Sequence, residues 1–375
     1  MQVKPLYARQ NGCEIEEGWA VCSDDGAEQY SSACANTMMS RYGRQYLPAL
    51  CIGGVATRPE YRRMGCVRRL LDHVFALAPE RGWAVSLLHP FSFSYYRKFG
   101  YERIADHKIV TFPMRALDFV PRCAALCPVQ DERRLRDALT VFARFAETRN
   151  ILFQRFDGRH YALQPSETNR ATYLWYDGQG QPAAYVTVGV EKVLVVNHME
   201  SVNLHVYELV YSSPASLLAA LGFLRMYEGE LDSVKIHNCA MMPELDFVLR
   251  HYTHTGYTLV PDIMGRILDV PAVLEANRYP EREGRFVLRV EDTLPYTRGV
   301  YEVEYGGGEA RVRRLAEHAD CDLSAPMPAL TQLLYGFETY TPENAAYLPG
   351  VTMPGDASDF FRAFPKRENG LFEHF

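Results

Sequence analysis

The sequence predicts an α/β protein that is divided into several domains. Its 375 residues exceed the length of one ordinary hydrophobic core. Domains of about 100–150 residues make two or three segments the natural division, and we expect three. Apolar runs of strand length alternate with amphipathic stretches of helical period, as in α/β folds. Hydrophobic residues make up 47% and charged residues 23% of the chain, which is the composition of a globular protein.

The first segment begins with a hairpin and a buried strand. Asp25-Gly26 follows the apolar run 18–22 and precedes the stretch 29–39, so a hairpin turn is expected there. The continuous apolar run 50–57 predicts a buried strand, and Pro59 ends its hydrogen-bond ladder.

A helix and another strand follow in the same segment. Apolar residues at helical spacing predict an amphipathic helix: Val67, Leu70, Leu71, Val74, Phe75 and Ala78. Pro79 and Gly82 are expected to close this helix, and residues 83–88 to form the next strand. The order is therefore strand, helix, strand.

The second segment repeats this order. Strands are expected at 172–176, 183–190 and 204–211, then a helix from Ser213-Pro214 to Leu224, a strand at 233–237 and a helix near 243–252. The pattern indicates a duplicated α/β unit.

The third segment has a different pattern, typical of an α+β domain. Three short strands are expected at 285–290, 299–305 and 310–314, followed by a helix that starts near Ser324 and Pro326.

Charge, hydropathy and cysteine content exclude several classes of protein. A net charge of −6 argues against a nucleic-acid partner, which demands a basic face. No apolar run approaches the ~20 residues of a membrane span, and the N-terminus lacks a signal-peptide core, so we expect a cytoplasmic protein without membrane association. Nine cysteines occur without a Cys-x-x-Cys pair, and we therefore expect no metal site and reduced, inert thiols.

The strongest functional motif joins the strand at 50–57 to the following helix. A helix N-terminus presents unpaired N–H groups and partial positive charge, so it can hold a pyrophosphate by its backbone. Gly65 lets such a group come close, and Arg62 and Arg63 add charge-assisted hydrogen bonds. An ordinary turn with solvated arginines is the alternative, but the strand before and the helix after favour an anion site.

The residues of this motif resemble a known family. Val55-Ala56-Thr57, Tyr61-Arg62-Arg63-Met64-Gly65 and the later run Tyr95-Tyr96-Arg97-Lys98-Phe99-Gly100-Tyr101 look like the GNAT acetyltransferases of the enhanced intracellular survival (Eis-like) branch. The resemblance implies two tandem GNAT-like domains, at 1–125 and 126–268, and a sterol-carrier-like domain at 269–375. It also implies that acetyl-CoA is the co-substrate.

The resemblance implies roles for individual residues. The backbone of Val55, Ala56 and Thr57 would bind the pantetheine arm, and the region of Arg62, Arg63, Met64, Gly65, Cys66 and Val67 would bind the pyrophosphate. Residues 211–216 lack the Arg-x-x-Gly spacing, so the second domain should not bind CoA.

Transfer to an amine needs a base for the amine proton and an acid for the leaving thiolate. The resemblance implies that Tyr96 is the acid and that the α-carboxylate of Phe375 is the base. Leu371, Phe372 and Phe375 suit a docked terminus, although a tail that merely packs is an alternative. Glu373, His374 and His89 are competing bases.

These inferences together predict an N-acetyltransferase that acts on a primary amine. The acceptor is expected to be a small polycation such as an aminoglycoside, with a polyamine or protein lysine as alternatives. Only eighteen residues precede Trp19, where the family has a strand and two helices that wall the acceptor site. Either the wall is reduced or a neighbouring subunit supplies it, so we expect a homo-oligomer. The competing hypothesis is a lipid-carrier or scaffold protein with vestigial GNAT domains.

Overall fold

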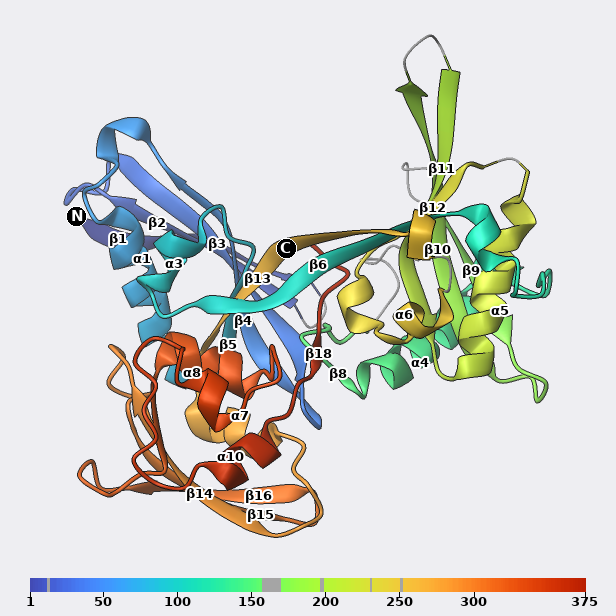
Figure 1. Ribbon diagram of the computed structural model, residues 1–375. Coiled ribbons are helices and arrows are strands. Elements are labelled where there is room, and N and C mark those ends of the chain that lie inside the picture. The colour runs from blue at the N-terminus through green and yellow to red at the C-terminus, as the bar shows by residue number, and fades with distance from the viewer. Residues whose placement is uncertain (12–13, 157–169, 196–198, 230, 250–251) are drawn as a thin grey trace. The chain divides into compact units, whose positions relative to one another are not determined.

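A computed structural model describes residues 1–11, 14–156, 170–195, 199–229, 231–249 and 252–375 (Figure 1). The chain forms two compact units. Unit 1 consists of Met1–Ala105, Asp262–Asn369 and His374–Phe375, and unit 2 consists of Asp106–Pro261 and Gly370–Glu373. Most of the first and third predicted segments therefore lie in unit 1, and most of the second lies in unit 2, which also takes residues 106–125 and 370–373.

The N-terminal part of unit 1 is a mixed sheet with the strand order β1-β2-β3-β4-β5-β13. Neighbours are antiparallel except β4 and β5, which are parallel. The hairpin predicted at Asp25-Gly26 joins β2 to β3 and is confirmed. The strands are β1 (Gln2–Asn11), β2 (Glu14–Cys22), β3 (Gln29–Tyr42), β4 (Gln45–Thr57), β5 (Val85–Leu88) and β13 (Gly256–Ile267), of which β13 enters unit 1 at Asp262.

Strand β4 continues past the end of β5. The two strands pair only from Ala49 to Ile52 of β4, whereas β4 extends to Thr57. On its other side β4 pairs with β3, with a register irregularity between the pairs Cys34–Gly53 and Ser32–Ala56. Such an irregularity bends a strand locally. Residues 53–57 therefore present one backbone edge that β5 does not cover.

The helices of this part are α1 (Cys66–Ala76), α2 (Ala78–Arg81) and α3 (Phe93–Arg97). The predicted amphipathic helix is α1, which buries its apolar residues on the sheet, among them Leu70, Leu71 and Val74. The expectation that Pro79 closes this helix is wrong. Pro79 lies in the first turn of α2, where proline needs no N–H partner, and Gly82 ends α2 with a positive φ of 67°.

The C-terminal part of unit 1 is a second sheet, with the order β16-β15-β14-β17, covered by helices (Figure 1). The predicted strands and helix are confirmed. Tyr42 of β3 donates a hydrogen bond of 2.7 Å to the carbonyl of Leu334. The elements are α7 (Val270–Ala276), β14 (Gly284–Glu291), β15 (Gly299–Gly306), β16 (Glu309–Leu315), β17 (Leu323–Pro326), α8 (Met327–Leu334), α9 (Pro342–Ala345), α10 (Ser358–Ala363) and β18 (Glu368–Asn369).

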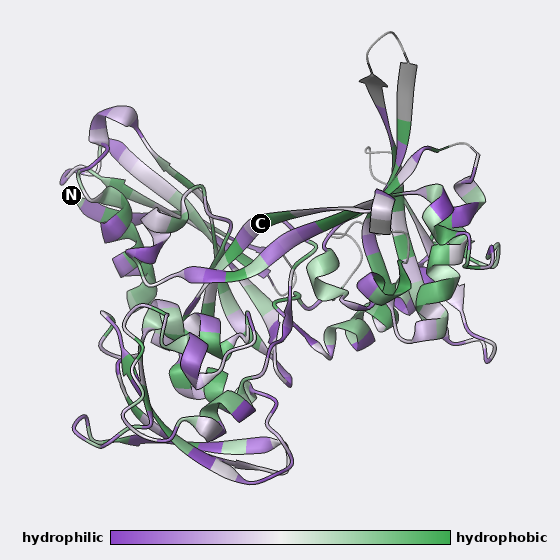
Figure 2. Ribbon diagram, in the orientation of Figure 1, coloured by the Kyte–Doolittle hydropathy of each residue, from purple (hydrophilic) through white to green (hydrophobic). Residues whose placement is uncertain are grey.

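Unit 2 contains a sheet of order β6-β12-β11-β10-β9-β7, on which α4 and α5 pack. The apolar residues that α5 contributes to the core stand out in Figure 2. The expected helix near 243–252 is shorter, and residues 250–251 lie outside the described residues. The elements are β6 (Glu102–Pro113), β7 (Cys127–Pro128), α4 (Glu132–Ala146), β8 (Arg149–Asn150), β9 (Arg170–Tyr176), β10 (Pro182–Val195), β11 (Met199–Tyr211), α5 (Pro214–Leu224), β12 (Ser233–Ile236) and α6 (Glu244–Val248).

The two units repeat one arrangement of strands and helices. In unit 1 an antiparallel pair, β3 and β4, leads through α1 to the parallel neighbour β5. In unit 2 the antiparallel pair β10 and β11 leads through α5 to the parallel neighbour β12. The duplication predicted from the sequence is therefore present in the fold.

All the described cysteines are free thiols, and Cys13 lies outside the described residues. Burial raises the pKa of the Cys51 thiol well above its ordinary value and that of Cys239 to about 12, which disfavours the thiolate. Within the described ranges, no helix is long and apolar enough to cross a membrane.

Candidate active site

A pocket of about 790 Å³ lies between the end of β4, the start of α1 and helix α3. It is lined by every residue predicted to bind the cofactor except Met64, whose side chain is 49% exposed. Six further residues line the pocket, and the sequence predicted a cofactor-binding role for none of them: Tyr61, Arg68, Phe91, Tyr95, Lys98 and Phe99.

Gly65 stands at the N-cap of α1 and faces open space. Its φ of 77° is in the left-handed region, which glycine adopts without strain. No described atom lies within 4 Å of the position that a Cβ would take there. The first amides of α1 have no partners within the helix, and the helix dipole adds partial positive charge. This cradle fits a pyrophosphate.

The side chains around the cradle are cationic. Arg62, Arg63, Arg68 and Lys98 line the pocket, and none of its described lining residues is acidic. Two of these cations also lie over aromatic rings, Arg68 at 5.0 Å from the Phe99 ring centre and Lys98 at 5.9 Å from that of Tyr95. The pocket therefore suits a ligand with several negative charges.

Tyr96 lies on α3, which begins at the N-cap Ser92. Its side chain is only 3% exposed, and its ring contacts Phe91 and Tyr95 at centroid distances of 5.4 and 5.3 Å. Desolvation, with a smaller contribution from Tyr95, raises the pKa of Tyr96 to about 12. The phenol therefore stays protonated at neutral pH and can donate a proton. Tyr101, by contrast, is fully buried in the core against Ser86.

The C-terminus is docked in unit 1. A Cβ at Gly53 would stand 3.4 Å from the backbone oxygen of Phe375, so the terminal carboxyl group lies directly against β4. The Phe375 ring lies 4.9 Å from the ring of His89. The prediction that the terminus does not fray agrees with these contacts.

Both predicted catalytic residues lie against the segment that follows β5. His89 contacts Phe375, and Phe91, two residues later, contacts Tyr96. Phe375 thus lies beside the first residue after β5 and Tyr96 beside the third, and the two residues are 279 positions apart in the sequence, at 375 and 96.

The competing bases have different surroundings. His89 Nδ1 lies 2.8 Å from Asp262 Oδ1, and its Nε2 is buried without a partner among the described residues. Glu373 is held in an ion pair with Arg155. His374 is exposed, with its ring 4.6 Å from that of His89. Asp262 was not found by sequence analysis, because no local pattern connects it to His89.

The equivalent helix start in unit 2 is occupied by its own side chains. Ser213 and Ser216 form a capping box in which each hydroxyl accepts the other's backbone N–H. Ser216 Oγ also accepts the N–H of Ser212 at 3.1 Å. These amides already have partners, whereas no side chain caps the start of α1 at Gly65 among the described residues.

Unit 2 carries a line of three histidines on β6, on β11 and directly after β12. His237 Nδ1 lies 3.3 Å from His107 Nε2, and its Nε2 lies 3.0 Å from His205 Nδ1. His205 Nε2 is 2.7 Å from Glu191. Among the residues that the structure describes, no three His, Cys, Asp or Glu side chains are placed to hold a metal ion.

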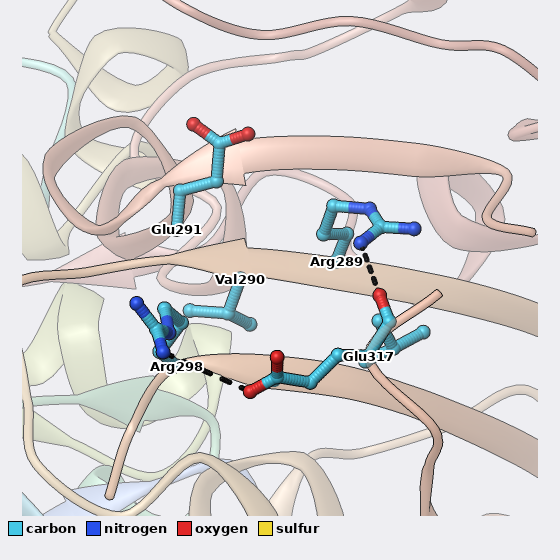
Figure 3. A pocket seen from close by; sticks show the side chains of 7 residues that line it. Arg289, Val290, Glu291, Arg298 and Glu317 are labelled. Carbon is cyan, nitrogen blue, oxygen red and sulfur yellow. Dashed lines mark hydrogen bonds and ion pairs between the residues drawn. The ribbon is translucent and has the colours of Figure 1, made fainter. Parts of the chain in front are cut away.

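The C-terminal domain has a pocket of about 290 Å³ beside β14 and β15 (Figure 3). Its lining includes Arg289, Glu291, Arg298 and Glu317. Arg298 pairs with the Glu317 carboxylate at 3.7 Å, and Arg289 donates to the Glu317 carbonyl at 2.6 Å. This charged lining does not suit an apolar ligand.

Comparison with known proteins agrees with this geometry. Residues 11–104 match the acetyltransferase (GNAT) domain family, and residues 270–370 match the sterol carrier protein domain family. No curated protein matches the sequence.

Solved structures share the fold of almost the whole chain. A GCN5-related N-acetyltransferase from Anabaena variabilis superposes with a TM-score of 0.80 at 19% identity, covering 96% of this chain and 89% of that one. Another, from Kribbella flavida, gives 0.75 at 22% identity, with coverages of 96% and 88%. Eis1 from Mycobacterium abscessus gives 0.73 at 18% identity, with coverages of 96% and 90%.

The family match places an acetyltransferase (GNAT) domain at residues 11–104, which include the cradle at Gly65. A sterol carrier protein domain follows the acetyltransferase domain along the chain, and this combination of domains is a more specific architecture. Residues 11–104 therefore belong to an acetyltransferase (GNAT) domain and residues 270–370 to a sterol carrier protein domain, as the resemblance implied. The hypothesis of a non-enzymatic lipid carrier is therefore not supported.

Proposed function

We propose that this enzyme transfers the acetyl group of acetyl-CoA to a primary amine of a small polycationic molecule. The main observation in support of this proposal is the cationic pocket at Gly65. Its open cradle and its helix amides suit the pyrophosphate of CoA. The exposed edge of Val55, Ala56 and Thr57 would bind the pantetheine arm, and Arg62, Arg63, Cys66 and Val67 would surround the phosphates with Gly65.

The chemistry divides between two groups of this chain. Acetyl-CoA supplies an activated thioester. The α-carboxylate of Phe375 accepts the proton that the amine loses on attack, directly or through one water, and Tyr96 protonates the departing thiolate. The raised pKa of Tyr96 keeps its phenol in the donor form. His89, oriented by Asp262, is the second candidate base, because its Nε2 is buried and lacks a partner among the described residues.

The domain division proposed here is 1–125, 126–268 and 269–375, with CoA bound only by the first domain. The capping box at Ser213 and Ser216 supports this, because it uses the amides that a phosphate would need. Asn11 of β1 pairs directly with Glu14 of β2. An acceptor site with this reduced wall would be completed by a neighbouring subunit in a homo-oligomer.

A turnover screen tests the proposal. The full-length protein is mixed with acetyl-CoA and an aminoglycoside, a polyamine or a lysine peptide, and thiol release is measured. We expect turnover with at least one polyamine-like acceptor and none with the corresponding neutral alcohol. A C-terminal extension of a few residues is expected to abolish turnover and to leave CoA affinity unchanged. Full activity of the extended protein would transfer the role of base to His89.

A further inference from the structure

Strand β13 carries a buried arginine that reaches the helix of the predicted acid. The Arg266 side chain is 1% exposed, and its Nη1 donates a hydrogen bond to the carbonyl of Phe99, two residues after the end of α3. The guanidinium group also lies over the ring of Phe75 in α1, with Cζ 4.9 Å from the ring centre. Arg266 therefore connects the end of α3 to the core of unit 1.

The carbonyl that Arg266 binds belongs to the turn that closes α3. The N–H of Phe99 donates to the carbonyl of Tyr96 at 2.9 Å, and the N–H of Tyr101 donates to the same oxygen at 3.4 Å. A buried carbonyl group needs a donor, and a cation near a helix C-terminus also interacts favourably with the helix dipole. Arg266 meets both requirements in the turn that holds the backbone of Tyr96.

Gly100 leaves the space into which the guanidinium group fits. Its φ of 82° lies in the left-handed region, which glycine adopts without strain. A Cβ at Gly100 would stand 2.7 Å from Cζ of Arg266, which is too close for two carbon atoms that are not bonded to each other. Any side chain at this position would therefore push Arg266 away from the carbonyl of Phe99.

A carboxylate of the C-terminal domain balances the charge of Arg266. Nη2 of Arg266 donates to both oxygens of Asp292, at 2.9 and 2.8 Å. The Asp292 side chain is only 3% exposed and directly follows β14. It also accepts the N–H of Thr293 at 2.7 Å and the hydroxyl of Thr297 at 2.6 Å. Its own domain thus fixes Asp292, and Asp292 holds Arg266 in one orientation.

We propose that the ion pair of Arg266 and Asp292 positions α3 and thereby the phenol of Tyr96. This inference rests on the proposed function, in which Tyr96 is the acid. All these residues belong to unit 1, and Asp292 lies within the stretch that matches the sterol carrier protein domain. That domain thus contributes to the reaction of the acetyltransferase domain. Arg266 and Asp292 are positioning residues, because they act only through α3.

The pair is better suited to fixing a position than to strengthening the fold. A buried ion pair contributes little net stability, but loss of one partner leaves the other charge buried and unpaired. Without the carboxylate of Asp292, the guanidinium group moves toward another acceptor, and the carbonyl of Phe99 loses its donor. Helix α3 has only five residues, so a shift of its end also moves Tyr96.

Hydrogen exchange of the amides of Phe99 and Tyr101 measures the position of α3 without reference to activity. Both amides bond the carbonyl of Tyr96, so they exchange when the end of α3 opens. In the full-length Asp292→Asn variant we expect exchange at least about 10-fold faster than in wild type, because the charge of Arg266 is unpaired. Arg266→Met should have the same effect. Arg266→Lys keeps the charge but not the fork of donors, and its exchange rate should be intermediate.

Glu302→Gln is the matched control for Asp292→Asn. Glu302 of β15 is also a carboxylate of the C-terminal domain, and its side chain is 7% exposed. Its ion-pair partners among the described residues are Arg285 and Arg313 of the same domain. Glu302→Gln should therefore leave both the exchange of α3 and kcat unchanged.

A double variant tests whether the pair acts through Tyr96. Asp292→Asn should lower kcat by up to about 10²-fold, the loss that a small displacement of a catalytic group can cause. The affinity for CoA, measured by calorimetry, should stay near the wild-type value, because the cradle at Gly65 is unchanged. In a Tyr96→Phe background the acid is already absent, so Asp292→Asn should give no further decrease.

The outcomes separate the positioning role from the proposed function. Unchanged exchange in folded Asp292→Asn would overturn the positioning role, as would additive losses of kcat in the double variant. Arg266→Lys preserves the charge balance and provides the same test if Asp292→Asn does not fold. Faster exchange with wild-type kcat would confirm that the pair holds α3 and would contradict Tyr96 as the acid. Faster exchange with a lower, non-additive kcat supports both.

Discussion

The terminal carboxyl group of Phe375 lies against Gly53, where an added Cβ would be 3.4 Å from its oxygen. Residue 53 is the point at which β4 passes the end of β5. A side chain there would therefore compete with the terminus for the same space, and glycine leaves room for it.

The first prediction uses this contact. Gly53→Val should displace the Phe375 carboxylate and lower kcat by about 10²-fold, the lower range for losing a general base. Gly53→Ala adds only one methyl group at an ordinary contact distance, so it should be milder. Steady-state kinetics with saturating acetyl-CoA would measure both. Equal kcat in Gly53→Val and wild type would argue that the carboxylate does not take part.

The second prediction concerns the cofactor cradle. Gly65→Glu should weaken CoA binding by about 10–100-fold, because a carboxylate would repel the pyrophosphate and take its hydrogen bonds. Gly82→Glu is the matched control, since Gly82 also has a positive φ and no described atom near its Cβ position. Calorimetry should show one CoA per chain in wild type. If the two variants lose affinity equally, general strain rather than the cradle is responsible.

The third prediction separates two neighbouring tyrosines. Tyr96→Phe should lower kcat by about 10²–10⁴-fold, as expected for loss of an acid, with CoA affinity near the wild-type value. Tyr95→Phe removes a hydroxyl from the residue that lines the pocket and should retain most of the turnover. Single-turnover measurements would show whether the chemical step is affected. The reverse order of effects would assign the acid to Tyr95.

The fourth prediction concerns pH and stability. Burial and the neighbouring His205 and His107 lower the pKa of His237 from 6.5 to about 4. Between these values the unfolded chain binds more protons than the folded one, so folded stability falls as pH decreases from about 6.5 to about 4. Thermal unfolding should show this loss in wild type. His237→Gln should flatten the dependence in that window, and an unchanged slope would assign it to other groups.

The sequence alone determined the local part of the site. The strand at 50–57, the loop with Arg62 and Gly65, and the helix at Cys66 follow one another along the chain. Their hydrophobic periods and the backbone needs of a helix start are local properties. The same holds for the strands of the third segment and for the helix start at Ser213. Each of these elements therefore lies at the position that the sequence predicted.

These local sequence patterns did not predict other elements of the structure. Sequence analysis missed β1, because its alternation is interrupted by charged residues and Pro5. It misplaced Pro79, because proline ends one helix and starts another with equal ease. It also missed Phe91 and Lys98, whose place in the pocket depends on how α3 packs.

Only the tertiary structure decided which distant residues meet. Phe375 lies beside Gly53, Asp262 orients His89, and Glu373 binds Arg155, across separations of 322, 173 and 218 positions. The separation of 322 positions is the difference between 375 and 53. No propensity or spacing within a short window carries such pairings, since they arise from the packing of whole strands and of the tail. The sequence therefore determined the strand, loop and helix at Gly65, and the fold decided which side chains lie beside His89 and the C-terminus.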